Sequence, residues 1–250
     1  MEKLCLITGG SKGIGFEIAK KMAEKEYTII LNSRNPFEAV RKLQEQNFKV
    51  IELAGSITEE SFLKNLIEIV ESYGYIDSVL INYGGPPIKP FLEVSEKEWV
   101  EYFNLMLLAP LTIIKELIKY LERSNYPRIV AITSFTSIKP IKNMVISNSL
   151  RIGLVNALKT IALEFADKNI LINAVAPGYI ETERLKDFIQ KQSQILNVEP
   201  NEYKKAIEKN IPLGRIGQAE ELAKFVSFLL SYENTYITGQ HFAFDGGITI

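Results

Sequence analysis

The residues with the clearest chemistry lie near the start of the chain, just after a short apolar run at residues 4–7. They read Thr8-Gly9-Gly10-Ser11-Lys12-Gly13-Ile14-Gly15. Glycines in such a turn let the backbone bend sharply and approach a ligand closely, and the helix that should follow offers free N–H groups and a positive dipole end. A strand, a glycine-rich turn and a helix in this order predict a pyrophosphate site, with a tight turn that binds nothing as the alternative. The residues expected to contact the cofactor here are Gly9, Ser11, Lys12, Gly13, Ile14 and Gly15.

The end of the second apolar run, residues 28–32, carries the residues that would select the dinucleotide. An NAD site of this kind usually has an Asp or Glu there, which binds the ribose hydroxyls. This chain has Ser33 and Arg34 instead. Without a carboxylate a 2′-phosphate is not repelled, and the Arg34 guanidinium can pair with it through two hydrogen bonds. The sequence therefore predicts NADP(H) in preference to NAD(H), unless Arg34 and Lys12 are ordinary surface cations.

A second set of polar residues lies in the middle of the chain: Ser134 in RIVAITS, and Ser147 and Arg151 in ISNSLRIG. A serine hydroxyl can both donate and accept a hydrogen bond. An arginine stays protonated in a protein, so Arg151 can bind a ribose hydroxyl or stabilise an oxyanion but cannot relay a proton. The alternatives are structural, with Ser134 as a polar strand end and Arg151 as a helix-surface cation.

Together these motifs resemble the short-chain dehydrogenase/reductase superfamily, and in particular its β-ketoacyl-ACP reductases. The resemblance extends over nearly the whole chain: NYGG at 82–85 resembles the family's Asn-Asn-Ala-Gly, PGYIET at 177–182 its PGxxxT, and DGG at 245–247 its usual end. It implies one dinucleotide-binding domain over residues 1–250, in which residues 183–212 form a helical flap over the substrate. The further cofactor contacts that it implies are Ser56, Ile57, Asn82, Gly84, Pro177, Gly178, Ile180 and Thr182.

The resemblance fails at the residues that move the proton. In the family a Tyr hydroxyl protonates the substrate oxygen and a Lys four residues later lowers its pKa, but here these positions are Ser147 and Arg151, and the family's Asn is Met106. A serine hydroxyl is shorter and far less acidic than a phenol. Losing general acid catalysis typically costs about 10² to 10⁴ in rate. Either the enzyme is slow, or another phenol donates the proton. The first candidate donor is Tyr179, which could instead be only an aromatic wall of the substrate pocket. The second candidate donor is Tyr83.

Three functions therefore remain open. The favoured one is an NADP(H)-dependent oxidoreductase that transfers hydride to or from a carbonyl or alcohol carbon, resembling a 3-oxoacyl reductase with a modified proton path. The second is a catalytically silent sensor or scaffold that only binds the dinucleotide, and the third is a lyase or isomerase that reuses the pocket. The retained phosphate site favours the first, because a site that binds nothing has no physical need for it.

The elements that must position these residues follow from the apolar pattern. Short apolar runs alternate with longer amphipathic ones, which is typical of repeated βαβ units. Because the runs are apolar throughout, helices should cover both faces, giving a three-layer α/β fold with a Rossmann-type doubly wound parallel sheet. The helix expected at 99–121 has more Leu and Ile than one sheet face needs, so we expect a homo-oligomer, and the resemblance implies a homodimer or homotetramer. The expected strands are 4–7, 28–32, 50–53, 78–81, 128–133, 170–175 and 242–244, and the first helix is 15–24.

Composition limits the remaining classes. The 250 residues are 46% hydrophobic, with a net charge of −1, which gives no electrostatic case for nucleic acid. The only cysteine, Cys5, excludes an internal disulfide, and no apolar stretch reaches the roughly 20 residues of a membrane span. His241 is the only histidine and has no companion metal ligands in the sequence. We expect a cytoplasmic protein that acts on a small carbonyl or alcohol, with no metal and no membrane partner.

Overall fold

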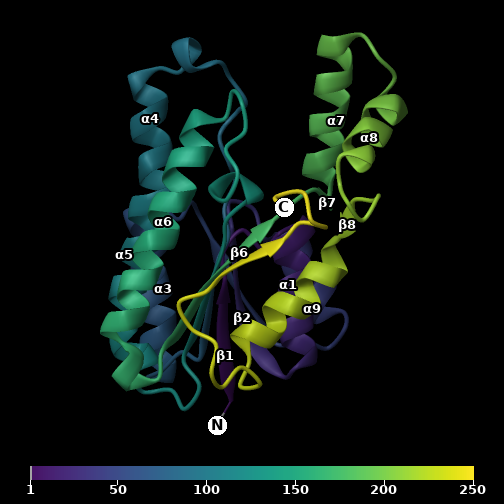
Figure 1. The fold of residues 1–250 in the computed structure, drawn as a ribbon. Coiled ribbons are helices and arrows are strands. Elements are labelled where there is room, and N and C mark those ends of the chain that lie inside the picture. Colours follow the sequence, from purple (N-terminus) through teal and green to yellow (C-terminus); the bar gives the residue numbers. More distant parts are fainter. Residues whose placement is uncertain (1) are drawn as a thin grey trace.

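A seven-stranded parallel sheet forms the centre of the computed structural model, which describes residues 2–250 (Figure 1). The strand order is β3-β2-β1-β4-β5-β6-β9, and every neighbouring pair is parallel. The order changes direction between β1 and β4, and such a switch point is where ligands bind in open α/β sheets. The predicted fold class is confirmed. The strands are β1 (Lys3–Ile7), β2 (Tyr27–Ser33), β3 (Val50–Ala54), β4 (Ser78–Ile81), β5 (Arg128–Ile132), β6 (Leu171–Pro177) and β9 (His241–Phe244).

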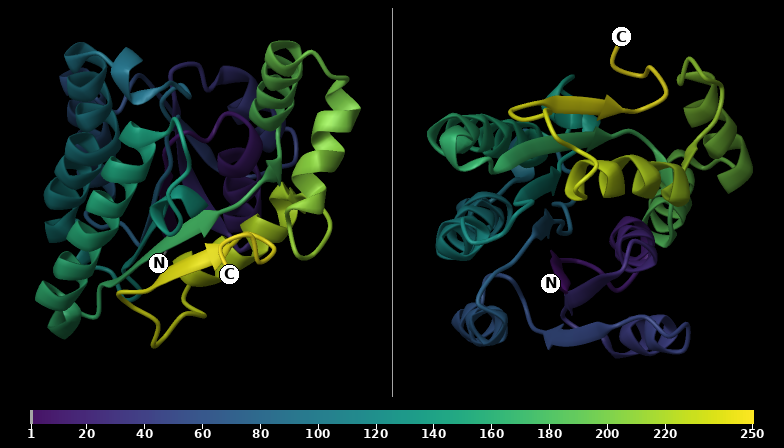
Figure 2. Two further views of the ribbon diagram at one scale, coloured as in Figure 1. Left: turned by 45° about the horizontal axis from the view of Figure 1, so that its top comes forward. Right: turned by 90° about the horizontal axis from the view of Figure 1, so that it is seen from below.

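Helices cover both faces of this sheet (Figure 2). Alternate residues of each strand enter different cores: Leu4 and Leu6 face one layer, whereas Cys5 and Ile7 face the other, and all four are fully buried. Burying one such side chain contributes about 1.5–3 kcal/mol. One layer contains α3 (Glu60–Tyr73), α5 (Ala109–Leu121) and α6 (Val145–Glu164), and the other contains α1 (Gly13–Glu24), α2 (Phe37–Gln44) and α9 (Ala219–Leu230).

The helix expected at 99–121 begins earlier and is not a regular α-helix throughout. It consists of α4 (Glu96–Phe103), a π-helical turn over Asn104–Leu108, and α5. Pro110 has no N–H to donate to the carbonyl of Met106 four residues before it. That carbonyl accepts a hydrogen bond from the Tyr83 hydroxyl instead, at 3.1 Å. The irregular turn thus places Met106 beside the end of β4.

Residues 183–212, expected to be helical, form two helices beyond the carboxyl edge of the sheet (Figure 1). They are α7 (Glu183–Leu196) and α8 (Pro200–Lys209). A two-stranded sheet of β7 (Ile180–Glu181) and β8 (Gly217–Gln218) lies at their base. Their own small apolar cluster includes Leu185, Ile189 and Ile207. None of the helices described within residues 2–250 has the length and apolar character to cross a membrane.

Candidate active site

The glycine-rich turn is held in a conformation that side chains would prevent. Gly9 and Gly13 have φ of 59° and 56°, in the left-handed region that favours glycine. A Cβ on Gly15 would lie 2.2 Å from the carbonyl oxygen of Gly9, so any side chain there would force the turn open. The amide of Gly10 donates to the carbonyl of Asn32 at 2.8 Å. The turn is therefore fixed against the end of β2.

Two distant segments support the same turn. The Asn82 side-chain amide donates to the carbonyl of Gly9 at 3.0 Å, and its backbone amide donates to the Thr8 hydroxyl at 2.8 Å. The methyl group of Thr182 lies 3.2 Å from the position that a Cβ of Gly13 would take. Asn82 therefore braces the turn from β4, and Thr182 approaches it from the start of α7.

The other residues expected to contact the cofactor lie along the same edge of the sheet. The Ile180 side chain is buried in the same core layer against which Ile14 packs, whereas Ile57 packs against the core layer on the other face of the sheet. The amide of Gly178 donates to the carbonyl of Phe244 at 3.0 Å, which joins Pro177 and Gly178 to β9. The Ser56 hydroxyl shares a hydrogen bond with the Thr58 hydroxyl. Gly84 is exposed and has open space beside its Cα. Ser11 is partly buried in the glycine turn.

The end of β2 offers cationic groups beside the glycine turn. Ser33 is partly buried, and its hydroxyl accepts a hydrogen bond from the amide of Asn35 at 3.2 Å. Arg34 and Lys12 are exposed, and Lys12 is the N-cap residue of α1. Among residues 2–250, neither forms an ion pair with a carboxylate. Both cations are free to pair with an anionic ligand.

A chain of hydrogen bonds joins the three polar residues from the middle of the sequence. Arg151 Nε donates to Ser147 Oγ at 3.1 Å, and Ser147 Oγ shares a hydrogen bond with Thr136 Oγ1 at 3.1 Å. The Thr136 amide donates to Ser134 Oγ at 3.2 Å, and Arg151 Nη1 donates to the carbonyl of Thr133 at 2.6 Å. Arg151 is thus an inward-facing residue of α6 and not a surface cation. Thr136, which the sequence did not single out, is the link between Ser134 and Ser147.

Arg151 is almost completely buried, which is unusual for a charged group. Its guanidinium carbon is 5.6 Å from the centre of the Tyr83 ring, and only 7% of the residue is exposed. Burial lowers the pKa of Arg151, although an arginine remains charged. Met106 is fully buried against Ile146 and Leu150. Because burial also raises the pKa of Tyr83, whose hydroxyl donates to a backbone carbonyl, this phenol is held in its protonated form.

Arg184, in the first turn of α7, reaches toward the same place. A Cβ on Gly85 would lie 2.8 Å from Arg184 Nη2 and 3.0 Å from Arg151 Nη2. Sequence reasoning missed Arg184, because a charged residue in a polar amphipathic helix indicates a solvated surface. Its only signal in the sequence is its position two residues after Thr182.

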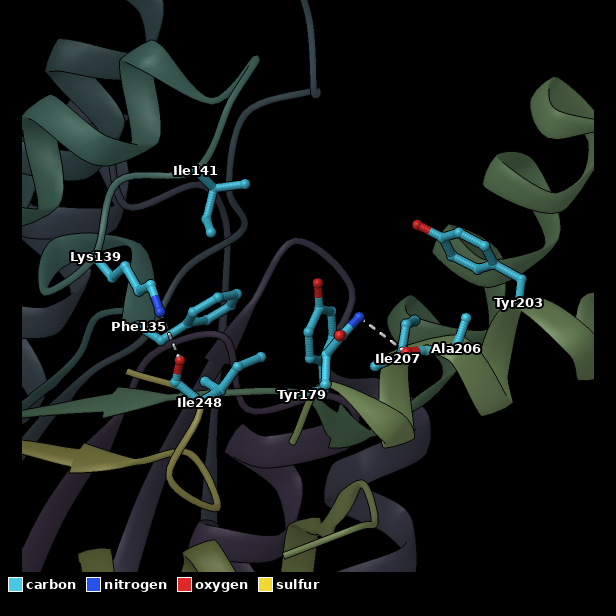
Figure 3. A pocket seen from close by; sticks show the side chains of 9 residues that line it. Phe135, Lys139, Ile141, Tyr179, Tyr203, Ala206, Ile207 and Ile248 are labelled. Atoms are coloured by element: carbon cyan, nitrogen blue, oxygen red, sulfur yellow. Dashed lines mark hydrogen bonds between the residues drawn. The ribbon is translucent and has the colours of Figure 1, made fainter. Parts of the chain in front are cut away.

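An aromatic pocket of 410 Å³ lies between the end of β5 and the helices beyond the sheet (Figure 3). The Tyr179 ring is 5.4 Å from that of Phe135 and 6.5 Å from that of Phe188, and Phe188 is 6.2 Å from Tyr203. The Tyr179 hydroxyl points into the cavity. Burial raises the pKa of Tyr179, so its phenol is also protonated at neutral pH. Tyr179 therefore forms a wall of the pocket with its hydroxyl directed at whatever the pocket holds.

Comparison with known proteins identifies the family of this chain. Residues 9–249 match the family model described as enoyl-(acyl carrier protein) reductase. The NADPH-dependent reductase BacG of Bacillus subtilis (strain 168) is 29% identical, over 98% of this chain and 97% of its own. The 3-oxoacyl-[acyl-carrier-protein] reductase FabG of Aquifex aeolicus (strain VF5) is 32% identical, over 98% of this chain and 97% of its own.

Solved structures agree with this assignment. The L-sorbose reductase from Gluconobacter frateurii, complexed with NADPH and L-sorbose, superposes with a TM-score of 0.93 at 27% identity, over 98% of this chain and 96% of that one. YwfH, an NADPH dependent reductase involved in bacilysin biosynthesis, gives a TM-score of 0.92 at 28% identity, over 99% of this chain and 98% of that one. The chain belongs to the short-chain dehydrogenase/reductase superfamily, and several of its relatives are NADPH-dependent reductases.

Proposed function

We propose that this protein is an NADP(H)-dependent oxidoreductase that transfers hydride between the nicotinamide and a carbonyl or alcohol carbon. The observation that carries the proposal is the glycine turn, because a Cβ on Gly15 would collide with the backbone of Gly9 at 2.2 Å. A turn that excludes side chains so strictly, with Asn82 and Thr182 closing on it, suits a pyrophosphate. The NADPH dependence of BacG and the NADPH bound in the L-sorbose reductase complex support the same cofactor.

The preference for NADP(H) over NAD(H) rests on charge. Ser33 carries no charge to repel a 2′-phosphate, and the unpaired cations of Arg34 and Lys12 can bind it. An isolated ion pair at an exposed site contributes only about 0–1 kcal/mol. We therefore expect the two cations and the missing carboxylate to act together in setting the preference.

At the reaction site, bound NADPH supplies the hydride. Ser134 Oγ donates a hydrogen bond to the substrate oxygen, and the Arg151 charge stabilises the negative charge that develops there. Ser147 orients Arg151 through the 3.1 Å hydrogen bond to Nε and does not itself act as the acid. Tyr179, whose hydroxyl points into the pocket, donates the proton to the oxygen as hydride adds to carbon. Residues 183–212 act as a flap that covers the substrate.

We also propose that the protein is a cytoplasmic homodimer or homotetramer. Apolar side chains remain exposed on the outer faces of α4 and α6, where Val100 is 61% and Leu163 is 81% exposed. Phe103 and Leu108 add to this surface. Exposed apolar side chains on these two outer helices support an interface with a second copy of the chain. Sedimentation velocity would measure the state, and a monomer would contradict this part of the proposal.

Calorimetric titration with NADPH and then NADH tests the main proposal. We expect micromolar binding of NADPH and at least about tenfold weaker binding of NADH, equal to about 1.4 kcal/mol. Binding of neither nucleotide would contradict the oxidoreductase. Binding without turnover on any carbonyl would favour the silent sensor or scaffold. If the double substitution Ser147→Tyr and Arg151→Lys leaves a measurable turnover unchanged or lower, the native pair belongs to a working site, whereas a large gain would indicate a degraded one.

A further inference from the structure

Two guanidinium groups from distant parts of the chain meet beside Gly85. Arg151 comes from α6 and Arg184 from α7, yet the Nη2 atoms of both lie within 3.0 Å of the position where Gly85 would carry a Cβ. Two atoms of Arg151 are already engaged, since Nε donates to Ser147 and Nη1 donates to the carbonyl of Thr133. No protein partner within residues 2–250 accepts from its Nη2. Arg184 makes neither a hydrogen bond nor an ion pair with any of these residues.

This arrangement is unfavourable without a ligand. No carboxylate within residues 2–250 pairs with either arginine. Burial lowers the pKa of Arg151, and the nearby positive charge of Arg184 lowers it as well. A buried charge without a partner is costly, and a second like charge adds to the cost. An oxyanion between the two Nη2 atoms would remove both penalties, because guanidinium groups bind carboxylates and phosphates through strong charge-assisted hydrogen bonds.

We infer that Arg151 and Arg184 together bind a carboxylate group of the substrate; this inference rests on the proposed oxidoreductase function. The cofactor phosphates have other donors, since the pyrophosphate is expected at the glycine turn and the 2′-phosphate at Arg34. Arg151 is instead connected through Ser147 and Thr136 to Ser134, the residue proposed to hold the reacting oxygen. The carboxylate would therefore lie beside the carbonyl and not beside the phosphates.

The adjacent pocket suggests the rest of the substrate. Phe135 follows Ser134 directly and forms one wall of the aromatic pocket, with Tyr179 and Tyr203 along it. Aromatic and aliphatic side chains bury the apolar body of a ligand. The substrate class that fits both features is a carboxylic acid with a reducible carbonyl and an apolar, preferably aromatic, body.

Gly85 gives a test that leaves both charges in place. Its φ lies outside the left-handed region, so an alanine is compatible with the backbone. The alanine methyl group would occupy the position 2.8 Å and 3.0 Å from the two Nη2 atoms and would push both guanidinium groups apart. The nearer of the two, Arg184 Nη2, is the far end of an exposed side chain that can move away, so the fold should tolerate the change. Gly85→Ala should therefore weaken anion binding while it preserves net charge.

The experiment is a calorimetric titration of the wild type, Arg184→Gln and Gly85→Ala, each with and without saturating NADP⁺. The probes are benzoate, phenylacetate and 3-phenylpropanoate, each compared with its neutral amide. Arg41→Gln is the matched control, because Arg41 is an exposed arginine of α2. We expect the wild type and Arg41→Gln to bind at least one acid about tenfold more tightly than its amide, in line with a charge-assisted hydrogen bond. Arg184→Gln should abolish this preference, Gly85→Ala should reduce it, and NADPH affinity should stay within about threefold in both.

The outcomes separate this inference from the proposed function. If no acid is preferred over its amide, or if the preference survives in Arg184→Gln, the carboxylate site is wrong even when NADPH binds normally. If Arg184→Gln loses NADPH affinity and the wild type shows no acid preference, the arginines bind the cofactor phosphates, and the inference is again overturned. If the acid preference depends on Arg184 but NADPH does not bind, the carboxylate site stands and the oxidoreductase proposal fails.

Discussion

Removing one of the two converging positive charges should stabilise the protein when no ligand is bound. The change is Arg184→Gln, which keeps a polar side chain of similar length. Arg184 Nη2 and Arg151 Nη2 lie 2.8 Å and 3.0 Å from one point, so the two nitrogens are at most about 6 Å apart. Unit charges at that separation repel by about 3 kcal/mol at an effective dielectric constant of about 20. Arg184 is exposed along part of its side chain, so solvent screening should reduce the gain in unfolding free energy to about 1 kcal/mol. For a chain of this size, that corresponds to a rise in Tm of about 2–4 °C.

Differential scanning fluorimetry of the nucleotide-free protein measures this rise. Arg184→Lys keeps the charge and should show little or no gain. Arg41→Gln removes a positive charge that pairs with Glu38 and Glu45, so it should not raise Tm either. Because salt screens repulsion, the gain from Arg184→Gln should shrink as NaCl is raised from about 0.05 M to about 1 M, where the Debye length falls to about 3 Å.

A ligand should reverse the order of stability. Phenylacetate at saturating concentration should raise the Tm of the wild type by mass action and leave Arg184→Gln almost unchanged. A lower Tm for Arg184→Gln, an equal gain for Arg184→Lys, or a gain that does not depend on salt would refute the electrostatic reasoning. Such a result would mean that Arg184 stabilises the fold through its contacts and is not held there for an anion.

Three further predictions concern the cofactor and the proton donor. Gly15→Ala should abolish NADPH binding measured by calorimetry, because its Cβ would lie 2.2 Å from the Gly9 carbonyl oxygen. The circular dichroism spectrum should stay like that of the wild type. An unchanged Kd for NADPH would argue against a phosphate site at this turn. Ser33→Asp should shift the cofactor preference toward NADH, because a carboxylate repels the 2′-phosphate and accepts hydrogen bonds from ribose hydroxyls. Fluorescence titration with NADPH and NADH measures this shift. If the variant still prefers NADPH, residues other than Ser33 select the cofactor. Tyr179→Phe should lower kcat by about 10² or more with a smaller change in KM, as expected for a general acid. Burial raises the pKa of Tyr179, so the phenol stays protonated up to at least the usual tyrosine pKa of about 10. The wild-type kcat should therefore stay constant as the pH rises from neutrality to about 10. A decrease in kcat near neutral pH would indicate that another group is the acid.

The fold was predictable because its strands are buried on both faces. A run such as residues 78–81 is apolar enough to be recognised without knowledge of its neighbours, and β4 has these bounds in the structure. The end of β6 was less predictable. It was expected at residue 175 but extends to Pro177, where it pairs with Phe244 of β9. Strand ends depend on a partner that the local sequence does not specify.

The site was predictable only where a residue type and its neighbours carry the information. The glycine turn is contiguous, so its conformation could be inferred from spacing. The pairing of Arg184 with Arg151 could not, because it joins α6, α7 and the loop after β4, and no local pattern shows that their side chains converge at Gly85. Thr136 was missed for a related reason: a short turn after β5 brings its hydroxyl to Ser147.

If Ser147 and Arg151 stand where the resembling family has its Tyr and Lys, as the sequence predicts, the two replacements can be interpreted as one change. A Lys at residue 151 would lower the pKa of a phenol at residue 147. Because residue 147 is a serine, there is no phenol whose pKa could be lowered. Arg151 Nε donates to Ser147 and Nη1 donates to the Thr133 carbonyl, and these bonds fix the guanidinium plane so that Nη2 lies beside Gly85. A lysine donates from a single nitrogen and cannot be anchored at two points while it presents a third donor to a ligand. On the proposals made above, Ser147 and Arg151 would therefore position a positive charge in place of activating a proton donor, and Arg184 would supply the second charge for binding an anion.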